Sequence, residues 1–380
     1  MGCELPNVYL VAGARPNFMK IAPIIRAIEA DGRLRYKLIH TGQHYDREMN
    51  DVFFDELGIP QPDVFMGCGG GTHAQQTAKI MVGFEELCSA NRPDCVLVVG
   101  DVNSTLASAI VAKKLGVPVA HVEAGLRSGD LAMPEEINRI VTDSISDWFF
   151  VTEPAGVANL RRDGKPESAI HFVGHVMVDN LLYQANKLKT SDVSRFETSS
   201  YKSTNISYGV VTLHRPSNVD NESVFAGIAA ALRQISAGLP LIFPVHPRTR
   251  ATMERFGIDM GQNVSLVGPL GYMEFLSLWK DARVVLTDSG GMQEETTALG
   301  VPCITVRENT ERPITIDEGT NVLAGTDADR ILAAARAIME GRGKPGRRPA
   351  LWDGRAAERI VDVLAAGLTS AAVRLSARQA

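Results

Sequence analysis

Short runs of apolar residues alternate with longer amphipathic stretches along most of this 380-residue chain. The run NVYLVAG (7–13), for example, precedes a stretch with apolar side chains at helical spacing (17–32). In the same way, DCVLVVG (94–100) precedes NSTLASAIVAKKLG (103–116). The apolar runs lack internal alternation, which is typical of strands buried on both faces of a parallel sheet. The pattern therefore predicts an α/β fold with helices on both faces of a doubly wound sheet.

A polar segment at 187–207 interrupts the pattern, which then begins again. Such a segment is typical of a domain boundary. We therefore expect two doubly wound, Rossmann-like domains, at 1–187 and 205–345. A glycine- and proline-containing linker (341–349) precedes one last predicted helix at 355–368.

Almost every predicted strand ends in a polar side chain. The side chains at these ends are Arg15, Gln43, His44, Asp101, Glu123, His214, Arg215, His246, Arg248, Asp288, Ser289, Arg307, Glu308 and Arg312. In doubly wound sheets, ligands bind beyond the carboxyl ends of the strands. The segment HVEAGLRSGDLAMPEEINR (121–139) carries six acidic or arginine side chains just after a buried apolar run, and a solvated turn is the alternative interpretation. We expect this segment to form one wall of a cleft between the two domains.

The segment TDSGGMQEE (287–295) suggests an anion site. Ser289, Gly290 and Gly291 lie between a predicted strand and a predicted helix. Glycine lets a ligand approach the backbone, and the free N–H groups of a helix start bind anions. A serine-capped turn without a ligand would give the same pattern. Neither G-x-G-x-x-G nor G-x-x-x-x-G-K-[ST] occurs, which argues against NAD and ATP.

Further side chains suit a bound diphosphate. Arg15 and Arg215, one in each domain, can pair with two phosphates. Glu295 is placed to accept hydrogen bonds from ribose hydroxyls, although a carboxylate in the first turn also suits the helix dipole. His214 and His246 stand next to Arg or Pro-Arg at strand ends, which favours a cleft position over a core position.

Composition adds limits to this interpretation. A net charge of −5 gives no reason to expect nucleic acid or a membrane surface as a partner. Five scattered cysteines without a C-x-x-C motif fit a reducing cytoplasm. No apolar run is long enough for a membrane span, and the N-terminus lacks a signal peptide's features. Asp101, Glu123, Glu135 and His214 are types that bind metals, but their spacing is not that of a metal site, and we expect no metal or other cofactor.

Nine motifs, in this order, resemble those of the non-hydrolysing UDP-N-acetylglucosamine 2-epimerases. They are GARPNFMK, TGQHYDREM, VVGDVNST, HVEAGLR, PEEINR, LHRP, FPVHPR, TDSGGMQEE and TERP, and they span residues 7 to about 325. The resemblance implies a glycosyltransferase-B arrangement of the two domains, an active site in the interdomain cleft, a homodimer, and a C-terminal helix (355–368) that joins the first domain. It implies catalytic roles for Asp101, Glu123, Glu135 and His214. The positions that resemble substrate or UDP contacts are Arg15, Lys20, Arg139, Arg215, His246, Ser289, Gly290, Gly291 and Glu295.

The implied reaction is C2 epimerisation of UDP-N-acetylglucosamine to UDP-N-acetylmannosamine, by elimination of UDP to a glycal and re-addition. Two opposite faces of C2 require at least two acid/base groups, which explains the several carboxylates. The segment TGQHYDREM, which holds Gln43 and His44, departs from the family pattern of the regulatory UDP-N-acetylglucosamine site. This departure and GARP also resemble enzymes that act on UDP-2,3-diacetamido-2,3-dideoxyglucuronate. A hydrolysing epimerase, a glycosyltransferase or a nucleotide-sugar sensor would also bind a nucleotide sugar in such a cleft.

Overall fold

The computed structural model describes residues 5–43, 54 and 56–379. The chain divides into two compact units, each with its own core. Unit 1 comprises Met1–Asn180 and Leu351–Ala380, and unit 2 comprises Leu181–Ala350. The first boundary therefore falls within helix α7 (Val176–Leu188), upstream of the expected polar segment. That segment carries two short helices, η2 (Val193–Arg195) and α8 (Ser199–Thr204).

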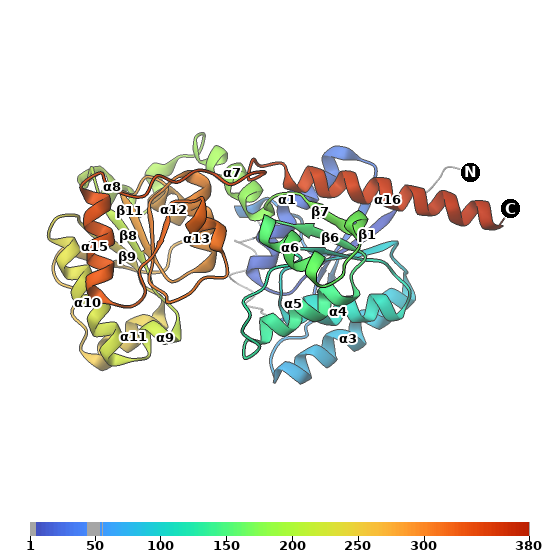
Figure 1. Ribbon diagram of the computed structural model, residues 1–380, viewed down its shortest axis with the longest axis horizontal. Coiled ribbons are helices and arrows are strands. Elements are labelled where there is room, and N and C mark those ends of the chain that lie inside the picture. Colours follow the sequence, from blue (N-terminus) through green and yellow to red (C-terminus); the bar gives the residue numbers. More distant parts are fainter. Residues whose placement is uncertain (1–4, 44–53, 55, 380) are drawn as a thin grey trace. The chain divides into compact units, whose positions relative to one another are not determined.

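Unit 1 contains a seven-stranded sheet in which every pairing is parallel (Figure 1). The strands lie in the order β3-β2-β1-β4-β5-β6-β7. Their bounds are β1 Asn7–Ala12, β2 Arg35–His40, β3 Val64–Phe65, β4 Cys95–Val99, β5 Val119–Val122, β6 Trp148–Val151 and β7 Ile170–Phe172. Besides α7, the described helices of unit 1 include α1 Arg15–Asp31, α3 His73–Ala90, α4 Asn103–Lys114, α5 Pro134–Ile145, α6 Pro154–Arg162, η1 Glu167–Ala169 and α16 Ala356–Gln379.

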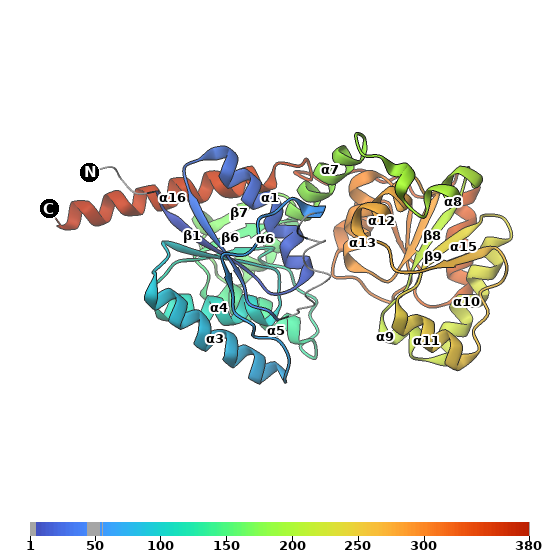
Figure 2. The ribbon, with the colours of Figure 1, turned by 180° about the vertical axis from the view of Figure 1, so that it is seen from behind.

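Helices cover both faces of the unit 1 sheet (Figures 1 and 2). Helices α3, α4 and α5 lie on one face and α1 and α16 on the other. Helix α16 packs along α1, and Ile360 and Leu364 share a buried cluster with Ile21 and Ile25. The helix continues to Gln379 rather than ending near residue 368, because residues 369–379 contain no glycine or proline to stop it.

Unit 2 repeats this architecture with six parallel strands, in the order β10-β9-β8-β11-β12-β13. The strands are β8 Gly209–Thr212, β9 Leu241–Pro244, β10 Val264–Val267, β11 Val284–Thr287, β12 Cys303–Thr305 and β13 Asn321–Leu323. The helices are α9 Pro216–Val219, α10 Glu222–Ser236, α11 Pro247–Phe256, α12 Tyr272–Trp279, α13 Gly290–Leu299, α14 Pro313–Asp317 and α15 Ala328–Met339.

Both sheets have the 3-2-1-4-5-6 strand order of the Rossmann fold, with one extra strand in unit 1. The strand order changes direction between β1 and β4 in unit 1, and between β8 and β11 in unit 2. Ligands of such folds bind at these switch points. The predicted pair of doubly wound α/β domains is confirmed. Among the described residues, no helix combines the length and the apolar character that a membrane crossing needs.

Candidate active site

Glu123 follows β5 directly and is held in an unusual backbone conformation. Its φ angle is 69°, in the left-handed region that non-glycine residues rarely adopt. The residue is only 3% exposed, and its Oε2 lies 2.6 Å from the Nζ atom of Lys20 on α1. Such strain is found where the surrounding structure fixes a functional side chain, and here it brings Glu123 to Lys20.

Gly100 makes room for this ion pair. A Cβ atom at position 100 would lie 2.9 Å from Lys20 Nζ. The φ angle of Gly100, 65°, also favours glycine. Gly100 precedes Asp101, so the same turn that admits Lys20 carries the next predicted catalytic carboxylate. The structure thus brings Lys20 and Glu123 together at the carboxyl edge of the unit 1 sheet.

Asp101, after β4, pairs with Arg139 of helix α5. The Arg139 Nη1 atom lies 2.5 Å from Asp101 Oδ2, and Asn138 Nδ2 donates to the Asp101 carbonyl oxygen at 2.8 Å. Arg139 also contacts Glu136 at 2.7 Å. Burial raises the pKa of Glu136, but the N–H groups of residues 128 and 129 and the Arg139 guanidinium outweigh it and hold the pKa below its ordinary value. Glu136 is therefore a buried anion that orients Arg139.

A buried histidine, His121, contacts the loop between β4 and α4 that carries Asp101. His121 is fully buried, with Nδ1 2.7 Å from Asp143 Oδ1 and Nε2 2.8 Å from the carbonyl oxygen of Gly100. Asp143 also accepts hydrogen bonds from Gly125 N and Arg127 Nη1. Burial raises the pKa of Asp143, but the adjacent His121 and Arg127 overcome this effect and lower it. This network ties the ends of β4 and β5 to α5.

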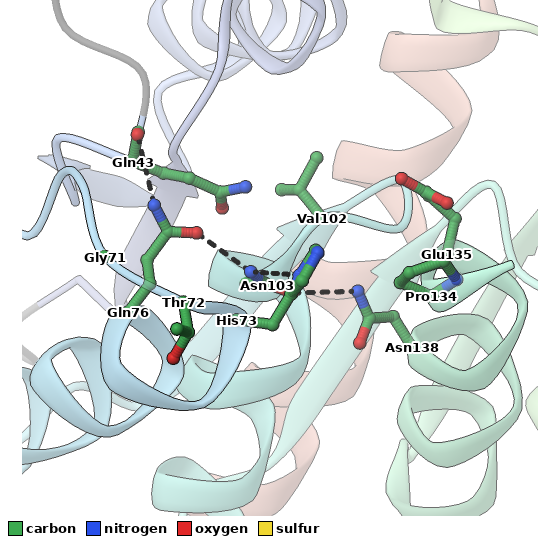
Figure 3. A pocket seen from close by; sticks show the side chains of 10 residues that line it. All are labelled: Gln43, Gly71, Thr72, His73, Gln76, Val102, Asn103, Pro134, Glu135 and Asn138. Carbon is green, nitrogen blue, oxygen red and sulfur yellow. Dashed lines mark hydrogen bonds between the residues drawn. The ribbon is translucent and has the colours of Figure 1, made fainter.

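Glu135 lies in the first turn of α5 and lines a pocket of about 320 Å³ (Figure 3). Gln43, in the loop after β2, lines the same pocket. The Gln43 Oε1 atom accepts hydrogen bonds from Ser104 N and Oγ at 3.0 and 2.7 Å. The pocket is polar, with Gln76, Asn103 and Asn138 joined by hydrogen bonds across its floor. His44, the other residue of the expected regulatory loop, lies outside the described residues.

In unit 2, His214 and Arg215 follow β8 and face Asp288, which follows the adjacent strand β11. Asp288 is fully buried and accepts hydrogen bonds from the backbone N atoms of His214 and Arg215. The His214 Nδ1 atom lies 2.9 Å from Asp288 Oδ1, while the His214 side chain is 52% exposed. Arg215 Nε donates to the Asp288 carbonyl oxygen at 3.0 Å. Asp288 thus organises both predicted functional residues of this loop.

The start of α13 has open space beside its two glycines. Ser289 occupies the N-cap position but its side chain makes no capping hydrogen bond to the helix among the described residues. Cβ atoms built on Gly290 and Gly291 meet nothing within 4 Å in the described part of the chain. Open space therefore adjoins both glycines, as a phosphate bound at this helix start would need.

Glu295 lies one turn into α13 and is 6% exposed. Burial, and then the negative charge of Glu294, raise the pKa of Glu295 to about 8, although a contact with the Tyr272 hydroxyl acts in the opposite direction. Glu294 itself lies 2.5 Å from Arg312 Nε. The raised pKa favours the protonated form of Glu295 at neutral pH, and this form both donates and accepts hydrogen bonds.

The other predicted binding residues lie at helix starts. Arg15 is the first residue of α1, and His246 is the N-cap of α11, where Nδ1 accepts from Arg248 N at 3.3 Å. The sequence signals missed Asp143 and the pairing role of Asp288, because nothing in the spacing shows which carboxylates point inward. Within the described ranges, no group of three or more His, Cys, Asp or Glu side chains is placed to hold a metal ion.

Two Rossmann-ordered sheets with charged strand ends and an open glycine-containing helix start define a two-domain α/β protein of the glycosyltransferase-B-like class. The sequence profile of the UDP-N-acetylglucosamine 2-epimerase family matches residues 26–365. The chain belongs to this family, as the nine motifs predicted.

Individual relatives agree with the family match. UDP-N-acetylglucosamine 2-epimerase of Methanocaldococcus jannaschii is 40% identical over 366 residues, which cover 94% of this chain and 98% of the relative. UDP-2,3-diacetamido-2,3-dideoxy-D-glucuronate 2-epimerase of Pseudomonas aeruginosa is 39% identical over 362 residues, which cover 94% of this chain and 99% of the relative. The crystal structure of the M. jannaschii enzyme in complex with UDP-GlcNAc and UDP superimposes with a TM-score of 0.83, at 39% identity, and covers 94% of this chain and 99% of that one.

Proposed function

We propose that this protein catalyses the reversible C2 epimerisation of a UDP-2-acetamido sugar, with UDP-N-acetylglucosamine and UDP-N-acetylmannosamine as the substrate pair. The observation that carries the proposal is the pair of carboxylates, Asp101 and Glu123, which follow adjacent strands and each contact a basic side chain. Two proton-transfer groups at one sheet edge are what inversion at a carbon requires. The names of the relatives support the nucleotide-sugar substrate.

The reaction follows from the chemistry of C2. No carbonyl adjoins this carbon, so simple deprotonation is too costly. Instead, the C2–H electron pair forms a C1=C2 double bond while the C1–O pair leaves with UDP, and the base takes the C2 proton. Re-addition of UDP to C1, with a proton delivered to the opposite face of C2, completes the epimerisation. Charge develops on the ring and on the diphosphate, so both carboxylates and cations are needed.

The proposal gives each predicted residue a role. Asp101 and Glu123 transfer protons at C2, with Glu135 and His214 positioning the reacting groups and tuning their charge. The remaining predicted residues hold UDP and the substrate: Arg15, Lys20, Arg139, Arg215, His246, Ser289, Gly290, Gly291 and Glu295. The open start of α13 supports this assignment for the diphosphate, and neutral Glu295 supports it for a ribose hydroxyl.

Product analysis tests this function. The purified protein, incubated with UDP-N-acetylglucosamine and no acceptor, should produce UDP-N-acetylmannosamine to a constant ratio without loss of total UDP-sugar. Free N-acetylmannosamine with stoichiometric UDP would instead indicate a hydrolysing epimerase. Turnover that requires a sugar acceptor would indicate a glycosyltransferase. Tight UDP binding with no product would leave only a sensor.

A second substrate is favoured by one observation. The P. aeruginosa relative, named for UDP-2,3-diacetamido-2,3-dideoxy-D-glucuronate, is as similar to this chain as the M. jannaschii enzyme, at 39% against 40% identity. The same elimination chemistry would serve either sugar. Parallel assays with both UDP-sugars decide between them, because the true substrate should have the larger kcat/KM.

We also propose that the protein is a cytoplasmic homodimer that pairs through helix α5. This helix turns its charged side chains inward, with Glu136, Arg139 and Asp143 buried. Its outward positions include Ile137 and Ile140, which are 48% and 39% exposed. Surface helices normally show the reverse distribution, so an apolar outer face supports contact with a second copy.

A further inference from the structure

Asp288 contacts both the backbone N–H and the imidazole ring of His214. The carboxylate is fully buried at the switch point between β8 and β11. Its Oδ2 accepts hydrogen bonds from His214 N at 3.0 Å, Arg215 N at 2.9 Å and Asn218 Nδ2 at 3.2 Å. Its Oδ1 lies 2.9 Å from His214 Nδ1. Oδ1 also accepts a longer hydrogen bond from His214 N, at 3.2 Å. Oδ2 therefore accepts most of the loop's hydrogen bonds, while Oδ1 is the oxygen that lies against the imidazole.

The contact with Oδ1 selects a tautomer of His214. The oxygens of Asp288 act as acceptors, since N–H groups of His214, Arg215 and Asn218 donate to them. An acceptor oxygen 2.9 Å from Nδ1 attracts a proton on that nitrogen and repels a lone pair. Nδ1 therefore carries the proton, and Nε2 is the nitrogen with the free lone pair in the neutral ring. The half-exposed ring can present this Nε2 to a ligand, whereas Asp288 is fully buried and has no such access.

We propose that Asp288 is a positioning residue that fixes His214 in the Nδ1–H tautomer, so that Nε2 is the atom presented to the substrate. This inference rests on the proposed epimerase function, which gives His214 a substrate to face. The neutral ring accepts a proton at Nε2, and the protonated ring donates from Nε2 to an anionic oxygen such as that of the departing diphosphate. A fixed ring removes the need for reorientation between these two states.

Replacement of Asp288 by Asn should reverse the tautomer. Three N–H donors converge on Oδ2, so the amide oxygen of an asparagine belongs in that position. The amide NH₂ group then replaces Oδ1 and faces His214 Nδ1. Because an NH₂ group is a donor only, Nδ1 must accept and the ring proton moves to Nε2. The loop keeps the three hydrogen bonds at the Oδ2 position and loses only the longer one from His214 N to Oδ1, so the variant should fold and retain UDP binding.

Nitrogen NMR of histidine-labelled protein tests the tautomer directly. The His214 signal is assigned by its loss in His214→Gln, and the tautomer is read at the alkaline limit of its titration. We expect Nδ1–H in the unaltered protein and Nε2–H in Asp288→Asn. An Nε2–H ring in the unaltered protein overturns the proposal without reference to any variant or to turnover.

Kinetics separate positioning from a structural role. Asp288→Asn should lower kcat about 10²-fold, as expected when a histidine's carboxylate partner is lost. If Asp288 acts through His214, the double variant with His214→Gln should be no slower than His214→Gln alone. Losses that multiply would show an independent, structural role and would overturn the inference. Asp281→Asn, a carboxylate of the same unit that is 46% exposed and paired with Lys202, is the matched control and should retain full activity.

Failure of the proposed function is distinguishable from failure of this inference. A protein that never epimerises a UDP-sugar would leave the kinetic cycle unmeasurable, but the two tautomers would still be observed. Conversely, if the protein epimerises a UDP-sugar but His214 carries its proton on Nε2, the proposed function stands and the positioning role of Asp288 is refuted.

Discussion

The raised pKa of Glu295 predicts an unusual pH dependence of stability. The carboxyl group is buried in α13, beside the charge of Glu294. The change that isolates its contribution is Glu295→Gln, which keeps the shape and cannot ionise. Both proteins contain every other titratable group, so the effects of those groups largely cancel in the difference between the two free energies of unfolding.

The size and sign of the effect follow from linkage. Burial and Glu294 raise the pKa from 4.5 to about 8, a difference of about 3.5 units. At about 1.36 kcal/mol per unit, the loss of stability approaches roughly 5 kcal/mol. The native state keeps a proton that the unfolded chain releases above pH 4.5, so stability falls as pH rises from 4.5 to 8. The penalty is absent below this window and complete above it.

Urea unfolding at one-unit steps from pH 5 to pH 9, followed by circular dichroism, measures the difference. We expect the stability advantage of Glu295→Gln to grow by several kcal/mol across this range and to level off above pH 8. Glu340→Gln, at a 55% exposed carboxylate of the same unit, should show no such growth. A difference between Glu295→Gln and the unaltered protein that stays constant with pH would refute the assignment of a desolvated carboxyl group.

Three further predictions concern unit 1. Asp101→Asn and Glu123→Gln should each lower turnover about 10²-fold or more in steady-state kinetics, while calorimetric titration should show that UDP affinity is retained. Loss of UDP affinity with turnover preserved would contradict the proton-transfer roles. Lys20→Met should destabilise the fold by about 3–5 kcal/mol because it leaves the Glu123 charge buried without Lys20, and adding Glu123→Gln should recover most of this loss. A double variant no more stable than Lys20→Met would argue against a buried ion pair. Ile140→Glu should halve the mass measured by light scattering if α5 forms the dimer contact, whereas an unchanged mass would place the contact elsewhere.

The sequence predicted the fold well because buried parallel strands leave a strong signal. The run CVLVV of β4, for example, is apolar throughout and fully buried in the structure. Strand ends were equally readable, so Asp101, Glu123 and His214 could be named as candidates before their geometry was known. The Rossmann order of both sheets then brings the ends of adjacent strands to one edge.

Partners of these side chains could not be read from the sequence. Glu123 meets Lys20, which is 103 positions away, and Asp288 meets His214, which is 74 positions away. Long-range pairs of this kind depend on strand order and side-chain direction, which local spacing does not encode. The sequence also did not show that α5 buries its charged face. Its residues have the periodicity of an ordinary amphipathic helix, but here charged side chains are buried and apolar ones are exposed.

Proton NMR of UDP-N-acetylglucosamine in D₂O tests directly whether the protein epimerises C2 through a glycal. The sample contains the purified protein and a chelator, and no NAD. Epimerisation through a glycal should place deuterium at C2 as the manno epimer accumulates, because each passage through the glycal exchanges the C2 proton with solvent-derived deuterium. Formation of the epimer with the original hydrogen retained at C2, or the absence of both epimer and exchange with either UDP-sugar, would contradict it.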